Sequence, residues 1–374
     1  MVVEQFPVMC RVSLSLLVLV ATVPLSQSFT TTRTVVAPPL LLARATSWTT
    51  RKPQCKDKKK LVLYSNESPV TFDLPEEGGG TSTTTASIFN LVKGIVGAGV
   101  LSLPAGVAAF GNAPSAAIPA VALIALIGTT SAYCFSLIGR VCAYTGAMSY
   151  RDAWNRSVGE SSSLLPAMSV TLKTIAAVVA YSMILADTFT SLFATVGIVG
   201  MTRTRSLLAL TTGILLPLCW LKNLSSLAPF SLLGSLGMVY TAIAMAIRYF
   251  QNAYYPDGRF TVAPDLEPSF GNVGMEGALS PNVFILICML STAYMAHFNA
   301  PKFYTELKNN TVERFNKVVS VSFFIAILIF AAITSVGYLT FGATSDGLIL
   351  NNYSTKDVLM SISRIAVAVS LVFS

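Results

Sequence analysis

The sequence predicts an all-α protein that crosses a membrane several times, and three observations lead to this prediction. Of its 374 residues, 53% are hydrophobic and only 11% are charged, whereas about 25% of the residues in ordinary soluble domains are charged. The mean hydropathy is +0.66. From Ala86 onward, apolar segments long enough to span a bilayer alternate with short polar connections. This composition is typical of a membrane protein, because side chains that face lipid are rarely charged.

The cysteine and histidine content excludes several kinds of site. The six cysteines are scattered and no two form a C-x-x-C pair, which argues against a disulfide framework and against a cysteine zinc site. His297 is the single histidine, so a multi-histidine metal site is excluded as well. The motifs H-E-x-x-H and G-x-S-x-G are absent from the sequence. We therefore expect no catalytic residues, no metal and no organic cofactor, and predict that the protein is not an enzyme.

The first 85 residues are predicted to be a targeting region. Residues 12–25 are apolar, follow Arg11 and precede small polar residues, so residues 1–28 are typical of a signal peptide. Residues 29–85 are Ser/Thr-rich, first basic and then flexible, as in a transit peptide. Nine basic and two acidic side chains in the first 60 residues account for nearly all of the net charge of +8, so the charge gives no reason to expect a nucleic acid partner. This order resembles the bipartite presequences of algae with complex plastids; a signal anchor with a disordered basic tail is the alternative.

Residues 86–374 are predicted to form the transmembrane domain. Helices are expected near residues 86–110, 115–138, 168–196, 206–221, 227–250, 282–304, 318–340 and 358–374. The connection 251–281 is the longest; it is polar and acidic, and no span is expected within it. Eight basic residues near the helix ends fall on the side of the amino end and five fall on the other. This is a weak positive-inside bias in favour of that topology.

The first span contains two glycines that predict a break in its helix. Gly97, Ala98 and Gly99 lie near the middle of FNLVKGIVGAGVLSLP, and each glycine weakens a helix by roughly 1 kcal/mol relative to alanine. Helices that break at bilayer depth do so where the freed backbone groups line a cavity. A half-helix that begins there can point its N–H groups at a substrate carboxylate. The alternative is a small-residue face that packs against another helix.

The sixth span carries a dense run of polar side chains. They are Ser291, Thr292, Tyr294, His297 and Asn299. Polar groups at this depth are unfavourable in lipid and indicate a cavity or a pathway. For His297 alone, a hydrogen bond to a backbone carbonyl explains the residue equally well. Interrupted first and sixth spans, five apart, are the pattern expected of inverted repeats around a shared site.

Four segments spread over this domain resemble a known family. They are FNLVKGIVGAGVLSLP (Phe89–Pro104), LPLCWLKNLSSLAPFSLLGSLG (Leu216–Gly237), MAHFNAPKFYTELKN (Met295–Asn309) and GYLTFG (Gly337–Gly342). In this order they are similar to the amino acid/auxin permease family of the amino acid–polyamine–organocation superfamily. The resemblance implies a leucine-transporter-type inverted-repeat fold that moves small neutral amino acids with protons or sodium.

The same resemblance assigns the substrate-binding residues. Gly97, Ala98 and Gly99 would bind the substrate carboxylate through their backbone N–H groups. Thr292, Ala293 and Tyr294 would lie at the break of the sixth helix, with their carbonyl groups facing the substrate ammonium. Such a site suits a neutral zwitterion, because opposed half-helix dipoles complement both of its ends.

Lys93 bears on the identity of the coupling ion. It lies four residues before Gly97, about one helical turn along the same face. Sodium-coupled members of the family have an asparagine linked to the sodium site there, whereas Lys93-Gly94 resembles the proton-coupled branch. An ammonium in the cavity repels Na⁺, and burial disfavours its charged form, which favours H⁺ over Na⁺. The alternative is that Lys93 extends to the membrane interface.

Other charged or titratable groups within the spans are less informative. His297 and Asp187 are further ion-coupling candidates, and Asp187 fits a helix end facing water equally well. Lys173 and Arg364 are the other charges within spans, and one sequence assigns them no partner.

The chain departs from the family in its number of spans. Members have about eleven spans, and this sequence reaches about eight before it ends inside the eighth helix, at Arg364–Ser374. We therefore expect an incomplete inverted-repeat fold, and favour a truncated sequence over a functional short form. A non-transporting amino acid sensor is the alternative function, although the short loops leave little surface for a signalling partner. The predicted partners are an amino acid substrate and the lipid bilayer.

Overall fold

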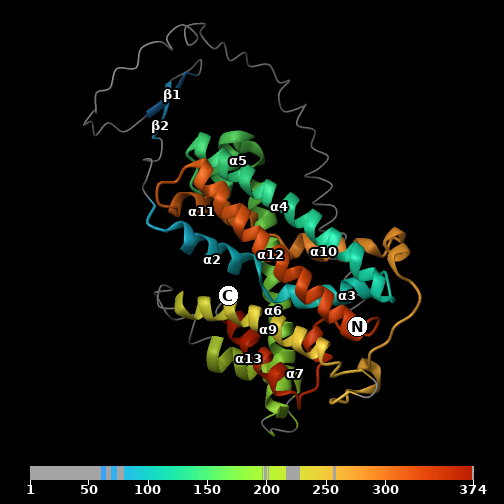
Figure 1. The fold of residues 1–374 in the computed structure, drawn as a ribbon. Helices are drawn as coiled ribbons and strands as arrows, with labels where there is room; N and C mark the ends of the chain where they lie inside the picture. Colours follow the sequence, from blue (N-terminus) through green and yellow to red (C-terminus); the bar gives the residue numbers. More distant parts are fainter. Residues whose placement is uncertain are drawn as a thin grey trace.

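The computed structural model describes residues 60–64, 69–73, 80–195, 197, 200, 202–215, 228–255 and 258–372. Long helices form a bundle, and a small hairpin precedes it (Figure 1). The prediction of an all-α polytopic architecture is confirmed for the bundle. The signal-peptide-like residues 1–28, most of residues 29–85, and residues 216–227 lie outside the described residues.

The hairpin was not predicted from the sequence. Strands β1 (Lys60–Tyr64) and β2 (Pro69–Asp73) are antiparallel, with Lys60 opposite Asp73 and Tyr64 opposite Pro69. Both strands are rich in β-branched and aromatic residues, which favour this conformation.

The first half of the bundle follows the predicted order. Its elements are α2 (Thr84–Ile95), the 3₁₀ turn η2 (Ala98–Ser102), α3 (Leu103–Ala108), the 3₁₀ turn η3 (Pro114–Ala116), α4 (Ala117–Thr145), α5 (Tyr150–Ser157), the 3₁₀ turn η4 (Glu160–Ser162), α6 (Leu164–Thr195), α7 (Arg203–Leu210), the π turn η5 (Thr211–Leu215) and α9 (Ala228–Phe250). The first predicted span is thus divided between α2 and α3, and the short helix α5 was not predicted.

The second half repeats the plan of a broken helix followed by a long one. Its elements are the 3₁₀ turns η7 (Pro264–Leu266) and η8 (Met275–Leu279), α10 (Val283–Ala293), the 3₁₀ turn η9 (His297–Asn299), α11 (Ala300–Glu306), α12 (Val312–Phe341), the 3₁₀ turn η10 (Ile349–Asn351) and α13 (Val358–Val372). The long helices that follow the two broken ones, α4 and α12, have 29 and 30 residues. Between α9 and α10, the described residues hold only short turns, as predicted.

Local sequence sets where several helices begin and end. Thr83, Ser149 and Thr311 precede α2, α5 and α12, and each side chain accepts a hydrogen bond from the N–H three residues further on. Gly146 follows α4 in the left-handed conformation (φ 68°), which a glycine adopts without steric penalty.

Four helical stretches are long and apolar enough to cross a membrane. They are Pro114–Thr145, Glu160–Phe193, Val283–Glu306 and Val312–Phe341. The bent pair of α2 with η2 and α3 makes a fifth if it is counted as one span. Eight spans were predicted; α7, α9 and α13 lie at the positions of the other three, and α13 has only 15 residues. Within the described part of the chain, length and composition thus support up to five spans.

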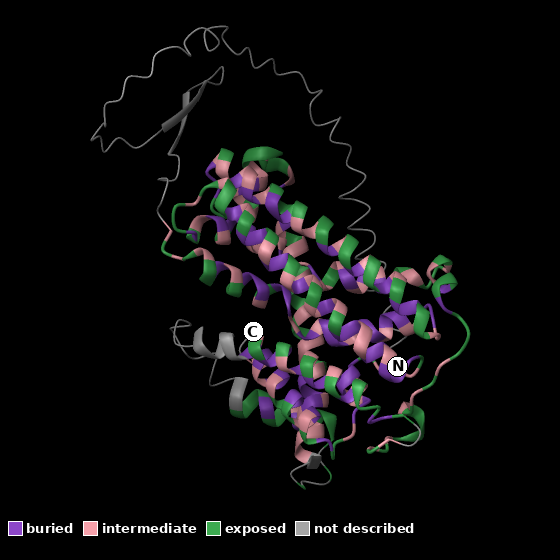
Figure 2. Ribbon diagram, in the orientation of Figure 1, coloured by how far each residue is buried: buried purple, intermediate pink, exposed green. Residues whose placement is uncertain are grey.

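The helix α12 lies at the centre of the described bundle and α6 at its edge. In the apolar window of α12, 44% of the residues are buried, against 6% in that of α6 (Figure 2). Along one side, α12 packs against α4, where a Cβ added to Gly139 would overlap the ring of Phe315. A Cβ at Gly128 would lie 2.6 Å from Ile327, so glycines let the two long helices approach closely.

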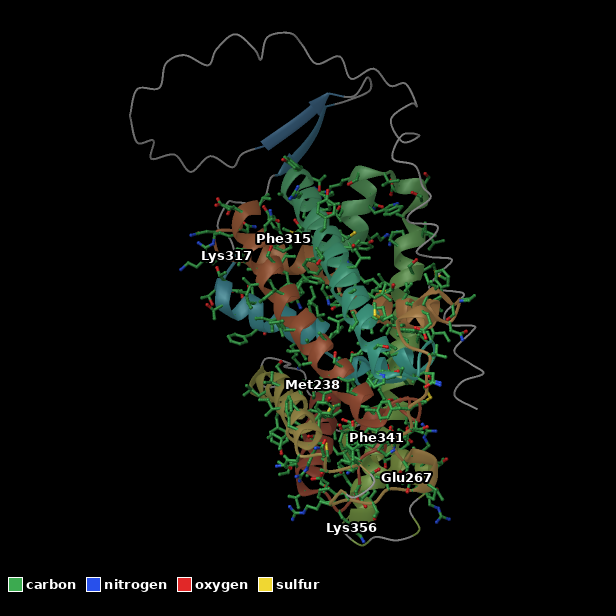
Figure 3. All side chains as sticks on the ribbon, turned by 45° about the vertical axis from the view of Figure 1, so that its right-hand side comes forward. Met238, Glu267, Phe315, Lys317, Phe341 and Lys356 are labelled. Atoms are coloured by element: carbon green, nitrogen blue, oxygen red, sulfur yellow. The ribbon has the colours of Figure 1, made fainter. Side chains whose placement is uncertain are left out.

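The connections lie at two opposite ends of the bundle. Lys317 lies at one end, and Glu267 and Lys356 lie at the other (Figure 3). We call the end with Lys317 the inner end and the end with Lys356 the outer end. At the inner end, the Arg314 guanidinium donates a hydrogen bond of 3.0 Å to the Thr84 hydroxyl, which joins the start of α12 to the start of α2.

Candidate functional site

The first broken helix opens at Val96 and Gly97. The helix α2 ends at Ile95, Val96 leaves helical geometry (φ −82°, ψ 82°), and Gly97 is extended (φ −102°, ψ −177°). Helical structure resumes at Ala98, and the axis bends by 42°. The N–H groups of Ala98 and Gly99 therefore begin a new helical segment, where N–H groups have no acceptor within their own helix. The break predicted from the glycine pair is present.

The second broken helix opens between Tyr294 and Ala296. The helix α10 ends at Ala293, and the residues after it have φ −81°, ψ 0° (Tyr294) and φ −116°, ψ 4° (Ala296). The turn η9 follows, and α11 begins at Ala300 with Pro301 in its first turn, a position that a proline tolerates. Because the α-helix does not continue beyond Ala293, the last carbonyl groups of α10 lack the N–H partners that a further helical turn would supply.

The two broken helices pack against each other. The helix α10 packs against both η2 and α3. A Cβ at Gly106 of α3 would lie 2.9 Å from the sulfur of Met289 and 3.0 Å from Leu286, so glycine is needed for this close approach. The segment that begins at the first break, where the partial charge is positive, thus packs against the helix whose partly negative end is the second break.

The side chain of Tyr294 has a packing role. It is fully buried, its hydroxyl donates a hydrogen bond of 3.3 Å to the Ile124 carbonyl on α4, and its ring lies 4.6 Å from that of Phe330 on α12. The hydroxyl of Thr292 bonds within its own helix, to the Cys288 carbonyl at 2.9 Å. The side chains of both predicted residues are therefore occupied. Their carbonyl oxygens also accept hydrogen bonds within the turn, that of Thr292 from the Met295 N–H (3.2 Å) and that of Tyr294 from the Ala296 N–H (2.9 Å).

One helix, α6, brings side chains to both breaks. The Tyr181 hydroxyl lies 3.3 Å from where a Cβ of Gly97 would be. Eight residues earlier, about 12 Å along the axis, the Lys173 ammonium sits 4.5 Å from the centre of the Phe298 ring in η9, a cation–π geometry. The sequence analysis gave neither residue a role, and their only signal was a polar group within a mainly apolar span that also carries Asp187 and several Ser and Thr residues.

His297 is held by a neighbouring helix. Its Nε2 lies 3.0 Å from the Ser131 carbonyl oxygen on α4, and its ring lies 5.9 Å from that of Phe135. This is the backbone-carbonyl partner that the sequence analysis left open as an alternative to a site role. Lys93 lies in the last turn of α2 and is partly buried.

Asp187 lies near the outer end of α6 and has a cationic partner there. Its carboxylate pairs with the Arg203 guanidinium at 2.6 Å, and 27% of the Asp187 side chain is exposed. Because α6 rises about 1.5 Å per residue, Asp187 lies about 9 Å beyond Tyr181. The structure thus places Lys93 and His297 beside the two breaks, and Asp187 in an ion pair outside them. Within the described ranges, no group of three or more His, Cys, Asp and Glu residues could hold a metal ion.

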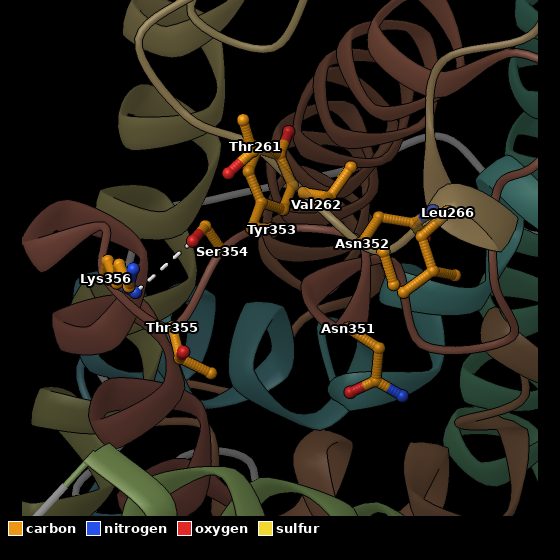
Figure 4. Close-up of a pocket in the computed structure, with 10 residues that line it drawn as sticks. Thr261, Val262, Leu266, Asn351, Asn352, Tyr353, Ser354, Thr355 and Lys356 are labelled. Atoms are coloured by element: carbon orange, nitrogen blue, oxygen red, sulfur yellow. Dashed lines mark hydrogen bonds between the residues drawn. The ribbon is translucent and has the colours of Figure 1, made fainter.

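A cavity of about 400 Å³ lies at the outer end, away from the breaks. It lies between residues 261–266 and residues 351–356, and Figure 4 shows the residues that line it. One wall is the turn after η10, in which the Lys356 N–H donates a hydrogen bond to the Ser354 hydroxyl. None of the predicted site residues lines this cavity.

Several curated proteins that are named as amino acid transporters are similar to this chain. The "Putative sodium-coupled neutral amino acid transporter 11" of Danio rerio is 24% identical over 303 residues, or 79% of this chain and 63% of the relative. The protein of the same name from Mus musculus is 22% identical over 305 residues, covering 80% and 63%. "Amino acid transporter AVT6E" of Arabidopsis thaliana is 25% identical over 279 residues, covering 71% and 54%.

The matches extend over most of this chain but less of its relatives. This chain spans between about half and two thirds of the length of these relatives. Its several apolar helices make it a multi-pass integral membrane protein. The family described as "Transmembrane amino acid transporter protein" matches residues 80–374, which include both broken helices. The chain therefore belongs to this family of transmembrane amino acid transporters, as the four sequence segments indicated.

Proposed function

We propose that the protein is a secondary active transporter of small neutral amino acids, with the substrate bound between the two breaks. The observation that carries the proposal is that both interrupted helices, α2–α3 and α10–α11, lie side by side inside the bundle. Broken spans of this kind place helix termini at the depth where a substrate is held. Family membership supports an amino acid as the substrate.

The proposed binding geometry uses backbone groups. The N–H groups of Gly97, Ala98 and Gly99 would receive the substrate carboxylate, where the start of η2 carries partial positive charge. The Gly97 N–H now donates to the Ile95 carbonyl at 3.0 Å and would exchange that bond for the carboxylate. The carbonyl groups of Thr292, Ala293 and Tyr294 would receive the ammonium at the partly negative end of α10. A neutral zwitterion satisfies both ends without a formal protein charge, which favours small neutral substrates.

We propose H⁺ as the coupling ion and Lys93 as the group that carries it. Lys93 lies one turn before the first break, so its ammonium occupies space that a bound Na⁺ would need. His297 and Asp187 are the other candidates, and their partners are the Ser131 carbonyl and the Arg203 guanidinium. The names of the vertebrate relatives favour Na⁺ as the second candidate.

The experiment for both proposals is uptake of labelled small neutral amino acids into proteoliposomes that contain the full chain. An inward proton gradient is expected to drive accumulation without Na⁺. No accumulation of any amino acid under either gradient would contradict transport. Accumulation that requires Na⁺ and ignores the proton gradient would contradict Lys93 as the coupling group.

Replacing Lys93 by arginine is expected to reduce proton-driven accumulation strongly, because a guanidinium does not release its proton in a protein. Coupling between two ligands is typically worth roughly 5- to 150-fold, and we expect a loss within this range. Exchange of internal for external labelled amino acid, which needs no net proton movement, is expected to persist. Lys302→Arg, at a side chain that is 71% exposed at the inner end, is the matched control. Proton-driven uptake at the wild-type rate in Lys93→Arg would exclude this role.

We propose in addition that residues 1–60 direct the protein to a plastid envelope. The support is the order of a signal-peptide-like segment followed by a basic, Ser/Thr-rich one. Residues 1–60 fused to a fluorescent protein are expected to reach the plastid of an alga with complex plastids. Residues 29–60 fused alone are expected to remain in the cytosol. Secretion of the longer fusion, or its retention in the endoplasmic reticulum, would refute the proposal.

A further inference from the structure

The outer end contains a buried cluster of charged side chains to which the proposed transport assigns no role. Arg248 on α9, Asp357 just before α13, and Arg364 on α13 are the charged residues that are buried in the described part of the chain. The Arg248 guanidinium donates two hydrogen bonds to the Asp357 carboxylate, at 2.7 and 2.8 Å. The Tyr254 hydroxyl donates a third, at 2.9 Å. The carboxylate is thus satisfied by groups other than Arg364.

Arg364 holds the loop that contains η10. The residue is 2% exposed, and its Nη2 donates hydrogen bonds to the carbonyl oxygens of Leu350 (2.8 Å) and Tyr353 (2.6 Å). Hydrogen bonds from a charged donor are roughly twice as strong as neutral ones. One side chain of α13 therefore fixes both ends of the segment 350–353.

The turn η10 lies directly on the first broken helix. It packs against η2, the segment that begins the proposed carboxylate site. Ile349 is fully buried, and both Ile349 and Pro104 of α3 lie against Gly337 of α12: a Cβ at Gly337 would be 3.1 Å from one and 2.8 Å from the other. A shift of η10 consequently changes what covers the break.

Arg364 is incompletely satisfied in this arrangement. Its Nε and Nη1 atoms are buried and have no hydrogen-bond partner within the described residues. The buried charges there are two guanidinium groups and one carboxylate, and that carboxylate pairs with Arg248, so the charge of Arg364 has no buried counter-charge among the described residues. Buried N–H groups without partners are rare because they lose their hydration without compensation. Such groups are expected where a side chain exchanges acceptors between two conformations.

We propose that Arg364 is the positioning residue of an outer gate formed by residues 349–353. In the present conformation it holds this turn on η2. In the open conformation it releases the Leu350 and Tyr353 carbonyl groups and uses its two free N–H groups for other acceptors. The gate rests on the proposed function, because a cover over η2 matters only if a substrate reaches the break.

Hydrogen exchange of the full chain in lipid nanodiscs tests whether Arg364 holds residues 349–353, and it does not require transport. The amide groups of Asn352 and Tyr353 donate to carbonyl groups within the turn, so their exchange reports its opening. Arg364→Met is expected to speed exchange in residues 349–353 about tenfold or more. Two hydrogen bonds from a charged donor together contribute more free energy than a tenfold change in the equilibrium between the closed and open turn requires. Arg364→Lys, which keeps the charge and a donor, is expected to restore most of the protection.

The control is Arg259→Met, which removes an exposed guanidinium at the same end of the bundle. Wild-type exchange rates in Arg364→Met would overturn the proposal. If that variant cannot be isolated folded, Arg364→Gln takes its place, and wild-type exchange in Arg364→Gln and Arg364→Lys alike would overturn it as well.

Kinetics separate a gate from a purely structural contact. In proteoliposomes, Arg364→Met is expected to raise the KM for the amino acid about tenfold and to change Vmax less, because the bound substrate is retained less well. A structural role alone would lower the amount of folded protein and leave KM unmoved, and that result would contradict a gate. If the wild type moves no amino acid, the proposed function fails, while the exchange rates still decide whether Arg364 holds the turn.

Discussion

Replacing Gly97 by valine is expected to reduce amino acid uptake about 100-fold, the loss that a misplacement of about 1 Å at a reacting or binding centre can cause. The expected cause is loss of space. The backbone of Gly97 is extended, a conformation that β-branched residues adopt readily, so valine introduces no backbone strain. A Cβ there would already lie 3.3 Å from the Tyr181 hydroxyl, and the two methyl groups of valine would project into the break.

Gly94→Ala is the matched control for this variant. A Cβ at Gly94 meets no atom within 4 Å and this residue has no proposed contact with the substrate, so uptake is expected to stay near the wild-type rate. Initial rates of labelled amino acid uptake into proteoliposomes, normalised to the amount of folded protein, compare the two. Wild-type uptake by Gly97→Val would show that the substrate does not bind at the break.

Replacing Asp357 by alanine is expected to lower the free energy of unfolding by about 3–5 kcal/mol, the penalty for removing one partner of a buried ion pair. The side chain is fully buried and accepts hydrogen bonds from Arg248, Tyr254 and the Leu359 N–H. Burial and the nearby carboxylate raise the pKa of the Tyr254 hydroxyl, which therefore remains a protonated donor. Without Asp357, the Arg248 guanidinium would stay buried without its counter-charge.

The double variant Arg248→Met with Asp357→Leu separates two contributions to the lost stability: the unpaired buried charge of Arg248 and the lost hydrogen bonds of Asp357. Apolar replacement of a whole buried pair is often neutral or stabilising, so the double variant is expected to be more stable than Asp357→Ala. Reversible denaturation of the purified protein in mixed micelles gives the comparison. A double variant less stable than Asp357→Ala would show that the pair itself contributes the stability.

The two breaks were predictable because their causes are local in sequence. The glycines at 97 and 99 weaken the first helix, and the polar run before Pro301 marks the second. The structure has both interruptions, at Val96–Gly97 and at Tyr294–Ala296. Their role in binding remains the prediction proposed above.

The contacts around the breaks were not predictable, because they depend on how each helix is rotated about its axis. Apolar residues lie on all sides of α6 among scattered polar ones, so its sequence does not reveal that Tyr181 faces Gly97 or that Lys173 faces Phe298. Arg364 was visible only as a charge within a span. Its partners lie in a loop 11 and 14 residues earlier, and no periodicity encodes that loop's fold.

The fit between Gly139 and Phe315 has a mechanical consequence. A phenyl ring that fills the space of a missing side chain locks α4 and α12 against sliding, because a shift of one residue would drive the ring into its neighbours. The helices α4 and α12 are therefore expected to move as one rigid unit. Any conformational change in the proposed transport would then occur in the broken helices on either side of this pair, where the backbone is already discontinuous.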